Sequence, residues 1–466
     1  MLPRIPLTRV LPFALCFMFA GCDEESEIEN ECGPGCDGEL IDVVLVTQSE
    51  IDEFGARQIR SIPGSLTIGN GISQSGIHTL EPLKDLESVG KDLNIFHNTE
   101  LATLDGLENL KSVGNSLTIQ YNVILENIDG IRNLTSSNIG VYLKDNPELA
   151  DLSPLAFLTN PDTLIIQGAS VKTLAGLDNV TSIDGPLYIY NCYNLENFDV
   201  LENLTSIGGS LTIDYNNKLN NLNGLRNVEE VGGQILIWNN NYMTTFGGFQ
   251  KLRVVEGDLK IQQNRNMVAI ELAVEEVKGS IDMQQNSSLR EITFTNLNSV
   301  RDGIYLSGHE MTYSGFSALT LVNGDLVIAG ESAQANQGFI NLQKVAGDLT
   351  VTSASGDLDD LANLEFVDGN FKIERSDITS VNGLASLKNI GGNVTIEHNP
   401  HLLNLDGLGA VNEIRDGVKI HSNKILKDFC GLTNVFQNGE TDVKLSTFAN
   451  AFNPTKDQIL AGDCSR

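Results

Sequence analysis

The sequence predicts an all-β protein, a parallel β-solenoid of about 16 coils with a small helical cap at each end. Its apolar residues fit neither the 3.6-residue period of a helix nor the two-residue period of a strand, and the pattern restarts once per copy. A marker position, usually Asn, stands three residues after the last strand Ile and returns every 22 to 24 residues from Asn98 onward. Such a period is typical of stacked coils, each laying a short strand on the coil before it.

The marker Asn side chains are expected to form a ladder at one corner of the solenoid, where each amide bonds backbone groups that strand pairing leaves unsatisfied. The coils from residue 283 to 378 are less regular, which indicates either a bend or a seam between two solenoid segments. The predicted ladder comprises Asn98, Asn122, Asn146, Cys192, Asn216, Asn240, Asn264, Asn286, Asn399 and Asn423, and other residues take the slot at Ala169, His309, Glu331, Ala354 and Ser376.

Inside each coil, the apolar positions are expected to stack into columns of Leu, Ile and Val. Glycines stand just before many of the predicted strands, where we expect them to permit a tight bend. The clearest examples are Gly114, Gly208, Gly209, Gly232, Gly233, Gly391 and Gly392.

The first 21 residues are expected to be a lipoprotein signal peptide. Arg4 and Arg9 supply a positive end, and the apolar run that follows is too short for a comfortable membrane span. The run ends in Phe19-Ala20-Gly21-Cys22, which resembles a bacterial lipobox with Phe where Leu is usual. Cys22 would then carry lipid and become the first mature residue. The alternative is ordinary signal cleavage that leaves Cys22 free.

Residues 22–39 are expected to form an acidic, solvated tether. We therefore expect a lipid-anchored protein of the bacterial cell envelope, at the outer membrane or cell surface. Asp23 directly follows the lipidation site, and this leaves retention at the inner membrane open. In an exported chain, Cys32 and Cys36 could close a small disulfide loop, with metal binding as the weaker alternative. The likeliest second pair is Cys430 with Cys464.

Both ends of the solenoid domain, residues 40–429, are expected to be covered. Thr47 and Glu50 fit a capping box, after which Ile51 and Phe54 form one apolar helix face before Gly55 ends the helix.

A second cap is expected at residues 430–466, closed by a disulfide. Here Asn453 would be the N-cap of a helix, Ile459 and Leu460 would point inward, and Gly462 would end it.

The chain is strongly acidic, with 30 Lys and Arg against 61 Asp and Glu and a formal net charge of −31. Such a field repels phosphate backbones, so we expect no nucleic-acid partner. The charge is best interpreted as keeping an extracellular solenoid soluble.

The recurring motif GL-x-x-L-x-x-[IV]-G-x-x-L-x-I-x-x-N-x-x-L resembles the receptor L-domain family, the leucine-rich β-solenoid modules of insulin- and epidermal-growth-factor-type receptors. The resemblance covers about residues 40 to 464. It implies a right-handed solenoid that recognises other molecules and has no active site or cofactor. A receptor L domain usually has far fewer coils than this chain, and no ligand-contact residues carry over.

An enzyme is the main alternative, because parallel β-helices also include polysaccharide lyases and hydrolases. Such enzymes need converging charged groups in a cleft walled by long loops, and the constant coil length provides no such insertion. Glu374, Glu397 and His421 share a column just after the strand, with His398 and His401 adjacent. We interpret this column as a solvated polar strip rather than an acid/base or metal site.

Aromatic residues gather in the first half of the chain, where seven of the nine Tyr and the only Trp fall between Tyr121 and Tyr242. Outward-facing aromatics can serve simply as cross-strand pairs, or they can form a docking stripe. The sequence thus favours a non-catalytic surface lipoprotein that recognises or adheres to an extracellular protein or glycan, and a passive envelope scaffold is a further alternative. The candidate ligand-binding residues are Phe96, Tyr121, Tyr142, Tyr188, Tyr190, Tyr215 and Trp238.

Overall fold

The computed structural model describes residues 42–70, 76–308, 311–330, 338–355, 358–438 and 443–466. Residues 40–466 form one compact unit. The predicted leader and tether lie outside the described residues, and so do Cys22, Cys32 and Cys36. Two of the marker positions, His309 and Glu331, lie outside them as well.

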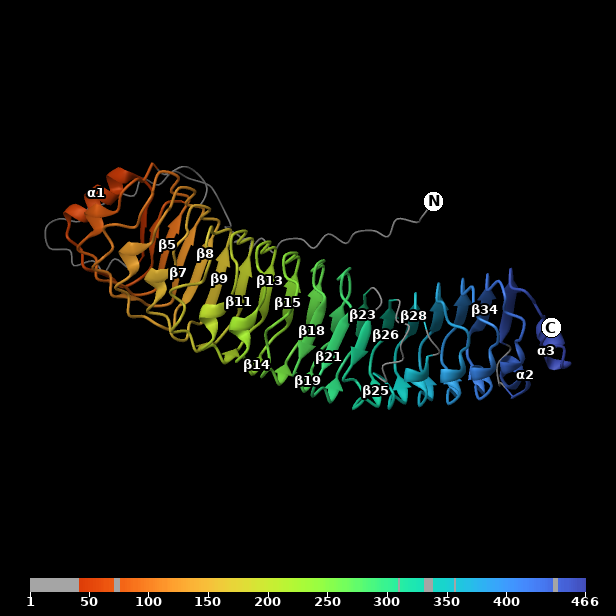
Figure 1. The fold of residues 1–466 in the computed structure, drawn as a ribbon. Helices are drawn as coiled ribbons and strands as arrows, with labels where there is room; N and C mark the ends of the chain where they lie inside the picture. Colours follow the sequence, from red (N-terminus) through yellow and green to blue (C-terminus); the bar gives the residue numbers. More distant parts are fainter. Residues whose placement is uncertain (1–41, 71–75, 309–310, 331–337, 356–357, 439–442) are drawn as a thin grey trace. The chain divides into compact units, whose positions relative to one another are not determined.

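A parallel sheet of 18 strands runs through the unit in chain order (Figure 1). The prediction of an all-β parallel solenoid is confirmed. The first and last strands lie beyond the 16 predicted coils. The strands are β1 (Val43–Leu45), β3 (Leu66–Ile68), β5 (Asp92–Phe96), β7 (Ser116–Gln120), β8 (Gly140–Lys144), β9 (Thr163–Gln167), β11 (Leu187–Tyr190), β13 (Leu211–Asp214), β15 (Ile235–Trp238), β17 (Leu259–Gln262), β20 (Ile281–Met283), β23 (Ile304–Ser307), β26 (Leu326–Ala329), β28 (Leu349–Thr352), β30 (Phe371–Glu374), β32 (Val394–Glu397), β34 (Gly417–His421) and β35 (Lys444–Phe448).

Two-residue strands form smaller parallel sheets earlier in most coils, with none in the described stretch between residues 113 and 182. In the region predicted to be irregular, the large sheet continues without a break through β20, β23, β26, β28 and β30, whereas the two-residue series stops after β22 and resumes at β25. The discontinuity is therefore confined to the small sheets. These are β2 (Ser61–Ile62), β4 (Ser88–Val89) and β6 (Ser112–Val113); β10 (Ser182–Ile183), β12 (Ser206–Ile207), β14 (Glu230–Val231), β16 (Val254–Val255), β19 (Glu276–Val277) and β22 (Ser299–Val300); and β25 (Leu321–Val322), β27 (Lys344–Val345), β29 (Phe366–Val367), β31 (Asn389–Ile390) and β33 (Glu413–Ile414).

The remaining side of most coils turns through a short 3-10 helix. Three successive coils carry a strand there instead, and these strands pair as β18 (Ala269–Leu272), β21 (Glu291–Phe294) and β24 (Thr312–Ser314). The 3-10 helices are η1 (Glu81–Leu83), η2 (Asp129–Ile131), η3 (Ser153–Leu155), η4 (Asp199–Leu201), η5 (Asn223–Leu225), η6 (Asp359–Leu361), η7 (Asn382–Leu384), η8 (Asp406–Leu408) and η9 (Cys430–Leu432).

The core consists of inward-facing Leu, Ile and Val side chains stacked coil upon coil. In β7, Leu117 and Ile119 point inward and are fully buried, while the residues between and beside them are half-buried on the other face. This two-residue alternation is what a strand needs when one face packs on a core. No helix among the described residues has the length and apolar character needed to cross a membrane.

The glycines before the strands have a different role from the predicted one. Gly114 and Gly232 do not have the positive φ angle that only glycine adopts easily. Instead, a Cβ atom on Gly114 would lie 1.9 Å from the carbonyl oxygen of Gly90, and one on Gly232 would lie 2.0 Å from that of Gly208. Each glycine thus permits close approach of the preceding coil's backbone.

The N-terminal end carries helix α1 (Gln48–Ala56), which packs against η1 and β1. The side chains of Thr47 and Glu50 form a reciprocal capping box, and Ile51 and Phe54 are buried. The expectation that Gly55 ends the helix is wrong, because the helix continues to Ala56. A Cβ atom on Gly55 would lie 2.3 Å from the carbonyl oxygen of Pro82, so this glycine is a packing contact.

The C-terminal end carries α2 (Thr433–Asn438), β35 and α3 (Lys456–Leu460). The N-cap of α3 is Thr455, which forms a capping box with Gln458, so the expectation that Asn453 caps this helix is wrong. Of the two side chains expected to point inward, Ile459 is buried and Leu460 is 38% exposed. Gly462 follows the helix with φ +90°. A disulfide joins Cys430 to Cys464, so the last residues are tied to η9.

Candidate functional site

The marker Asn side chains bridge each coil to the one before it. Oδ1 of Asn216 accepts the backbone N–H of Cys192 at 3.0 Å, and its Nδ2 donates to the carbonyl of Ile189 at 2.9 Å. The backbone N–H of Asn216 in turn donates to Oδ1 of Asn240 at 3.0 Å. The same pattern joins Asn98 to Asn122, Asn122 to Asn146, Asn240 to Asn264, Asn264 to Asn286 and Asn399 to Asn423.

Other residue types fill some rungs of this ladder. At position 376 a Ser takes the place of Asn, and its hydroxyl oxygen accepts a hydrogen bond from the N–H of Ala354 at 3.2 Å. Ala169 and Cys192 are buried small side chains, and burial raises the pKa of the Cys192 thiol to about 12. This thiol therefore stays protonated and packs as an apolar group.

The ladder has one further rung. Oδ1 of Asn450 accepts the N–H of Asn423 at 2.9 Å. The sequence pattern missed Asn450 because it lies 27 residues after Asn423, beyond the usual period. The signal that could have found it is an Asn two residues after the strand at residues 444–448, the same spacing as that of Asn216 after β13.

The predicted aromatic residues share the face of the large sheet that is turned away from the core, which we call the outer face. Side chains at the second and fourth strand positions point to this face. Positions are counted in register with β11, in which Tyr188 is second and Tyr190 is fourth. In this register Tyr142 also lies at the second position, and Phe96 and Trp238 lie at the fourth. Tyr121 and Tyr215 follow the strand at the corner, with φ +57° and +52°. These seven residues are named the aromatic face.

The aromatic face is divided into three columns rather than the single stripe expected. None of the seven side chains is the direct cross-strand partner of another. Tyr142 and Tyr188 both flank Ile165, which is only 8% exposed, and Leu236 lies two coils further along the same column. Ile165 and Leu236 were not among the predicted residues, although apolar residues at outward strand positions were the available signal.

A polar network runs through the fourth-position column. The Tyr190 hydroxyl donates to Oε1 of Gln167, and Nε2 of Gln167 donates to both carboxylate oxygens of Asp145 at 3.2 and 3.1 Å. Burial raises the pKa of Asp145, although Tyr121, Gln167 and Lys144 oppose the shift. Burial also raises the pKa of Tyr190, with Asp145 adding to the effect. Tyr190 is therefore held in place as a neutral hydrogen-bond donor.

Asp214 lies between Tyr190 and Trp238 as the cross-strand partner of both. Within the described part of the chain, Oδ1 of Asp214, Nε1 of Trp238 and Nδ2 of Asn239 are shielded from solvent and have no partner in normal hydrogen-bond geometry, although the Asn239 side chain is close enough to the Asp214 carboxyl to lower its pKa. Burial raises the pKa of Asp214 to about 6, and the nearby Asn239 amide offsets part of that shift. These three residues, named the Asp214 cluster, leave hydrogen-bonding capacity unused on two adjacent coils.

The structure brings Glu374, Glu397 and His421 together as the expected column. The carboxyl of Glu374 pairs with Lys372 at 2.9 Å, and that of Glu397 pairs with Lys419 at 3.1 Å. Burial alone would raise the pKa of Glu397, but Lys419, Lys372 and His398 outweigh it and the pKa is lowered. Glu397 is thus a paired carboxylate, unsuited to act as a general acid.

Among the described residues, His421 of this column contacts a hydroxyl of the neighbouring column, that of Ser446. Nε2 of His421 lies 3.0 Å from Oγ of Ser446, and burial together with the Lys419 charge lowers the pKa of the imidazole. A serine–histidine catalytic pair also needs a carboxylate that orients the imidazole. The neighbouring Glu397 carboxyl bonds Lys419 instead. His401 contacts Asp377 at 3.4 Å, away from this column's pairs. No group of three or more metal-ligating side chains occurs in the ranges that the structure describes.

A family model matches residues 205–303, a segment that contains β13, β15 and the Asp214 cluster. The matched family is the receptor L domain. The resemblance expected from the repeat motif is confirmed for this segment. A receptor L domain indicates a ligand-binding role for the solenoid.

Solved leucine-rich-repeat proteins are also similar to this chain. A Leptospira interrogans leucine-rich-repeat protein is 12% identical with a TM-score of 0.32, over 84% of this chain and 94% of that one. TLR13, solved in complex with ssRNA13, is 14% identical with a TM-score of 0.28, over 86% and 66%. An internalin (InlF) of Listeria monocytogenes is 16% identical with a TM-score of 0.23, over 88% and 89%. At these identities the three structures say nothing about a ligand of this chain. No curated protein compared with it matches significantly.

Proposed function

We propose that this protein is a non-catalytic, lipid-anchored recognition or adhesion protein of the bacterial cell surface. Its ligand would be an extracellular protein or glycan, bound through the aromatic face. The receptor L domain match over residues 205–303 supports the recognition role. The anchor would be lipid on Cys22, which the lipobox-like sequence supports.

The Asp214 cluster is the observation that carries this proposal. A buried polar atom without a partner costs about 1–3 kcal/mol, so three such atoms in one place call for an explanation. Asp214 is the cross-strand partner of both Tyr190 and Trp238, side chains of the type that dominates binding interfaces. A ligand that displaces the Trp238 ring could supply the missing hydrogen bonds.

The enzyme alternative gains no support from the candidate acid/base column. Glu374 and Glu397 are ion-paired, and the His421–Ser446 pair has no orienting carboxylate among its described contacts. The passive-scaffold alternative predicts no ligand at all, and binding experiments can therefore separate it from recognition.

The test compares the whole chain with the double variant Tyr188→Ala/Trp238→Ala on protein and glycan arrays. We expect at least about tenfold weaker binding of any ligand found, because large aromatic anchors carry most of an interface's energy. The matched control is Tyr305→Ala, since Tyr305 occupies the same strand position as Tyr188, five coils further along. Unchanged binding in the double variant would eliminate the aromatic face as the contact surface.

The anchor has its own test. Replacing Cys22 by Ser should move the protein from the membrane fraction to the soluble fraction and abolish labelling by a fatty-acid probe. Cys16→Ser, inside the leader, is the control. Labelling of intact cells with an impermeant reagent reports whether the solenoid faces outward.

A further inference from the structure

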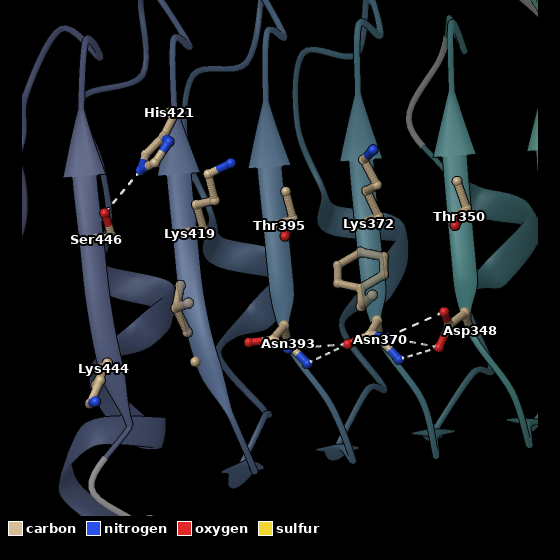
Figure 2. A pocket seen from close by; sticks show the side chains of 13 residues that line it. Asp348, Thr350, Asn370, Lys372, Asn393, Thr395, Lys419, His421, Lys444 and Ser446 are labelled. Atoms are coloured by element: carbon tan, nitrogen blue, oxygen red, sulfur yellow. Dashed lines mark hydrogen bonds between the residues drawn. The ribbon is translucent and has the colours of Figure 1, made fainter. Parts of the chain in front are cut away.

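A hollow of about 580 Å³, lined by both polar and apolar groups, opens on the outer face near the C-terminal end of the solenoid, across strands β28 to β35 (Figure 2). Two rows of side chains line it. One row is at the second strand position and includes Thr395, Lys419 and Ser446. The other row is formed by the residues that begin each strand or directly precede it. The hollow lies in other coils than the aromatic face.

Gly417 creates the open space in this second row. In the preceding coils the row is a chain of amide contacts, in which Asn370 Nδ2 donates to Asp348 Oδ1 at 3.1 Å and Asn393 Nδ2 donates to Asn370 Oδ1 at 3.3 Å (Figure 2). Gly417 is next in register and has no side chain to continue it. A Cβ atom there would meet only Lys444 O at 3.4 Å and Asn393 Oδ1 at 3.6 Å, which is ordinary contact. The fold therefore does not require glycine at this position.

Three lysines line the hollow in a chain whose net charge is −31. Lys372 and Lys419 pair with Glu374 and Glu397, and their side chains are 36% and 49% exposed. Their carboxylate partners are each only 17% exposed, so these two lysines stay paired, and a ligand carboxylate could approach them only as a further hydrogen-bond acceptor. Lys444 has no carboxylate within salt-bridge distance among the described residues. The hollow thus offers the ammonium group of Lys444, at one end, together with hydroxyl and amide groups, while its one lining carboxylate, Asp348, lies at the other end and is hydrogen-bonded to Asn370.

We propose that this hollow binds a sugar chain that carries carboxylates, as uronic acids do. The lysine ammonium groups match the carboxylates through charge-assisted hydrogen bonds. The hydroxyls of Thr395 and Ser446 and the amides of Asn370 and Asn393 match the sugar hydroxyls. An acidic peptide fits less well, because peptide interfaces depend on apolar anchors and the groups named here are polar.

The experiment titrates the whole chain with oligogalacturonate and with its methyl ester, in the presence of EDTA, by isothermal calorimetry. We expect saturable binding of the acid and at least about tenfold weaker binding of the ester, since a hydrogen bond to a charged group contributes about 1.5–3 kcal/mol. Lys444→Gln should remove most of this preference, and Gly417→Leu should block the acid by filling the space. Circular dichroism and thermal unfolding report whether the Gly417→Leu chain is folded.

The controls are Lys260→Gln and Tyr188→Ala/Trp238→Ala. Lys260 occupies the same strand position as Lys419 on β17, outside the hollow. Both variants should bind the acid as the unaltered chain does, which separates this site from the aromatic face. The proposal is overturned if neither sugar binds, if acid and ester bind equally, or if acid binding survives in folded Gly417→Leu or in Lys444→Gln.

Discussion

At Asp214, burial opposes ionisation on a surface that is otherwise rich in charge. The carboxyl lies between two aromatic rings, and one of its oxygens has no hydrogen-bond partner among the described residues. Desolvation therefore raises its pKa from 3.8 to about 6. A carboxyl with this pKa changes charge in mildly acidic conditions, and the binding properties of the surrounding aromatic face should change with it.

We predict that Asp214→Asn removes a pH-dependent loss of stability. Between pH 3.8 and 6 the folded chain binds more protons at Asp214 than the unfolded chain does, so its contribution to stability falls as pH rises through this window. Above pH 6 the full cost is present, on the order of 1 kcal/mol because the half-exposed carboxyl is partly screened. Both proteins are unfolded in urea at pH 4, 5, 6 and 7. The free energy of unfolding of the variant should rise relative to that of the unaltered chain as the pH increases. A constant difference over this range would contradict the prediction.

Single residues were predictable from the sequence where the repeat fixes their environment. The position of Asn216 follows from its spacing, and so does the burial of Leu211 and Ile213. The unpaired atoms of Trp238 and Asn239 could not be predicted, because they depend on how individual side chains turn on the outer face. Gly417 has no signal in the sequence either, since glycines before strands are common in this chain and most of them are in close contact with backbone.

The turn that enters strand β15 shows a constraint at the level of the element. Successive coils approach so closely there that only a hydrogen atom fits between Gly232 and the carbonyl oxygen of Gly208. The backbone angles at Gly232 are open to any residue. Strand stacking therefore restricts this position through the neighbouring coil.

Gly232→Ala should destabilise the solenoid by about 1–3 kcal/mol, the usual cost of forcing a methyl group into a packed site. Its new Cβ atom would lie 2.0 Å from the Gly208 oxygen. The matched variant is Gly417→Ala, where the nearest atom lies at 3.4 Å and little change is expected. Equal thermal stabilities of the two variants would show that the close approach is not limiting.

Elements at the two ends were predicted less well than the repeated ones. The capping box of α1 was visible in Thr47 and Glu50, but the start of α3 was misplaced. Both Asn453-Pro454 and Thr455 with Gln458 fit helix-start patterns, and only the local fold decides for Thr455. The three strands that replace 3-10 turns, β18, β21 and β24, also went unnoticed, because coil length stays nearly constant through them.

For the whole molecule, the central physical fact is that a solenoid holds its shape through contacts between neighbouring coils, while like charges along it repel. The chain carries a net charge of −31, and its described ion pairs are mostly exposed. Exposed pairs contribute little and are screened by salt, so repulsion is the larger long-range effect.

The midpoint temperature of unfolding should therefore rise by a few degrees when sodium chloride is raised from 20 to 200 mM, which shortens the screening length from about 20 to about 7 Å. For a lysine-rich, basic solenoid of similar length, the midpoint temperature of unfolding should also rise with salt, because its like charges repel in the same way. A midpoint that falls with salt would mean that ion pairs outweigh repulsion in this chain.

The ladder also has a direction, because wherever an Asn side chain accepts the N–H of a marker residue, that Asn belongs to the coil that comes later. The N–H of Cys192 finds its acceptor on Asn216, 24 residues further along, and the N–H of Asn423 finds its acceptor on Asn450. The N–H of a marker residue therefore stays unpaired until the coil that follows it has folded. Whichever coil folds first, each coil added on its C-terminal side completes the hydrogen bonds of the one before it.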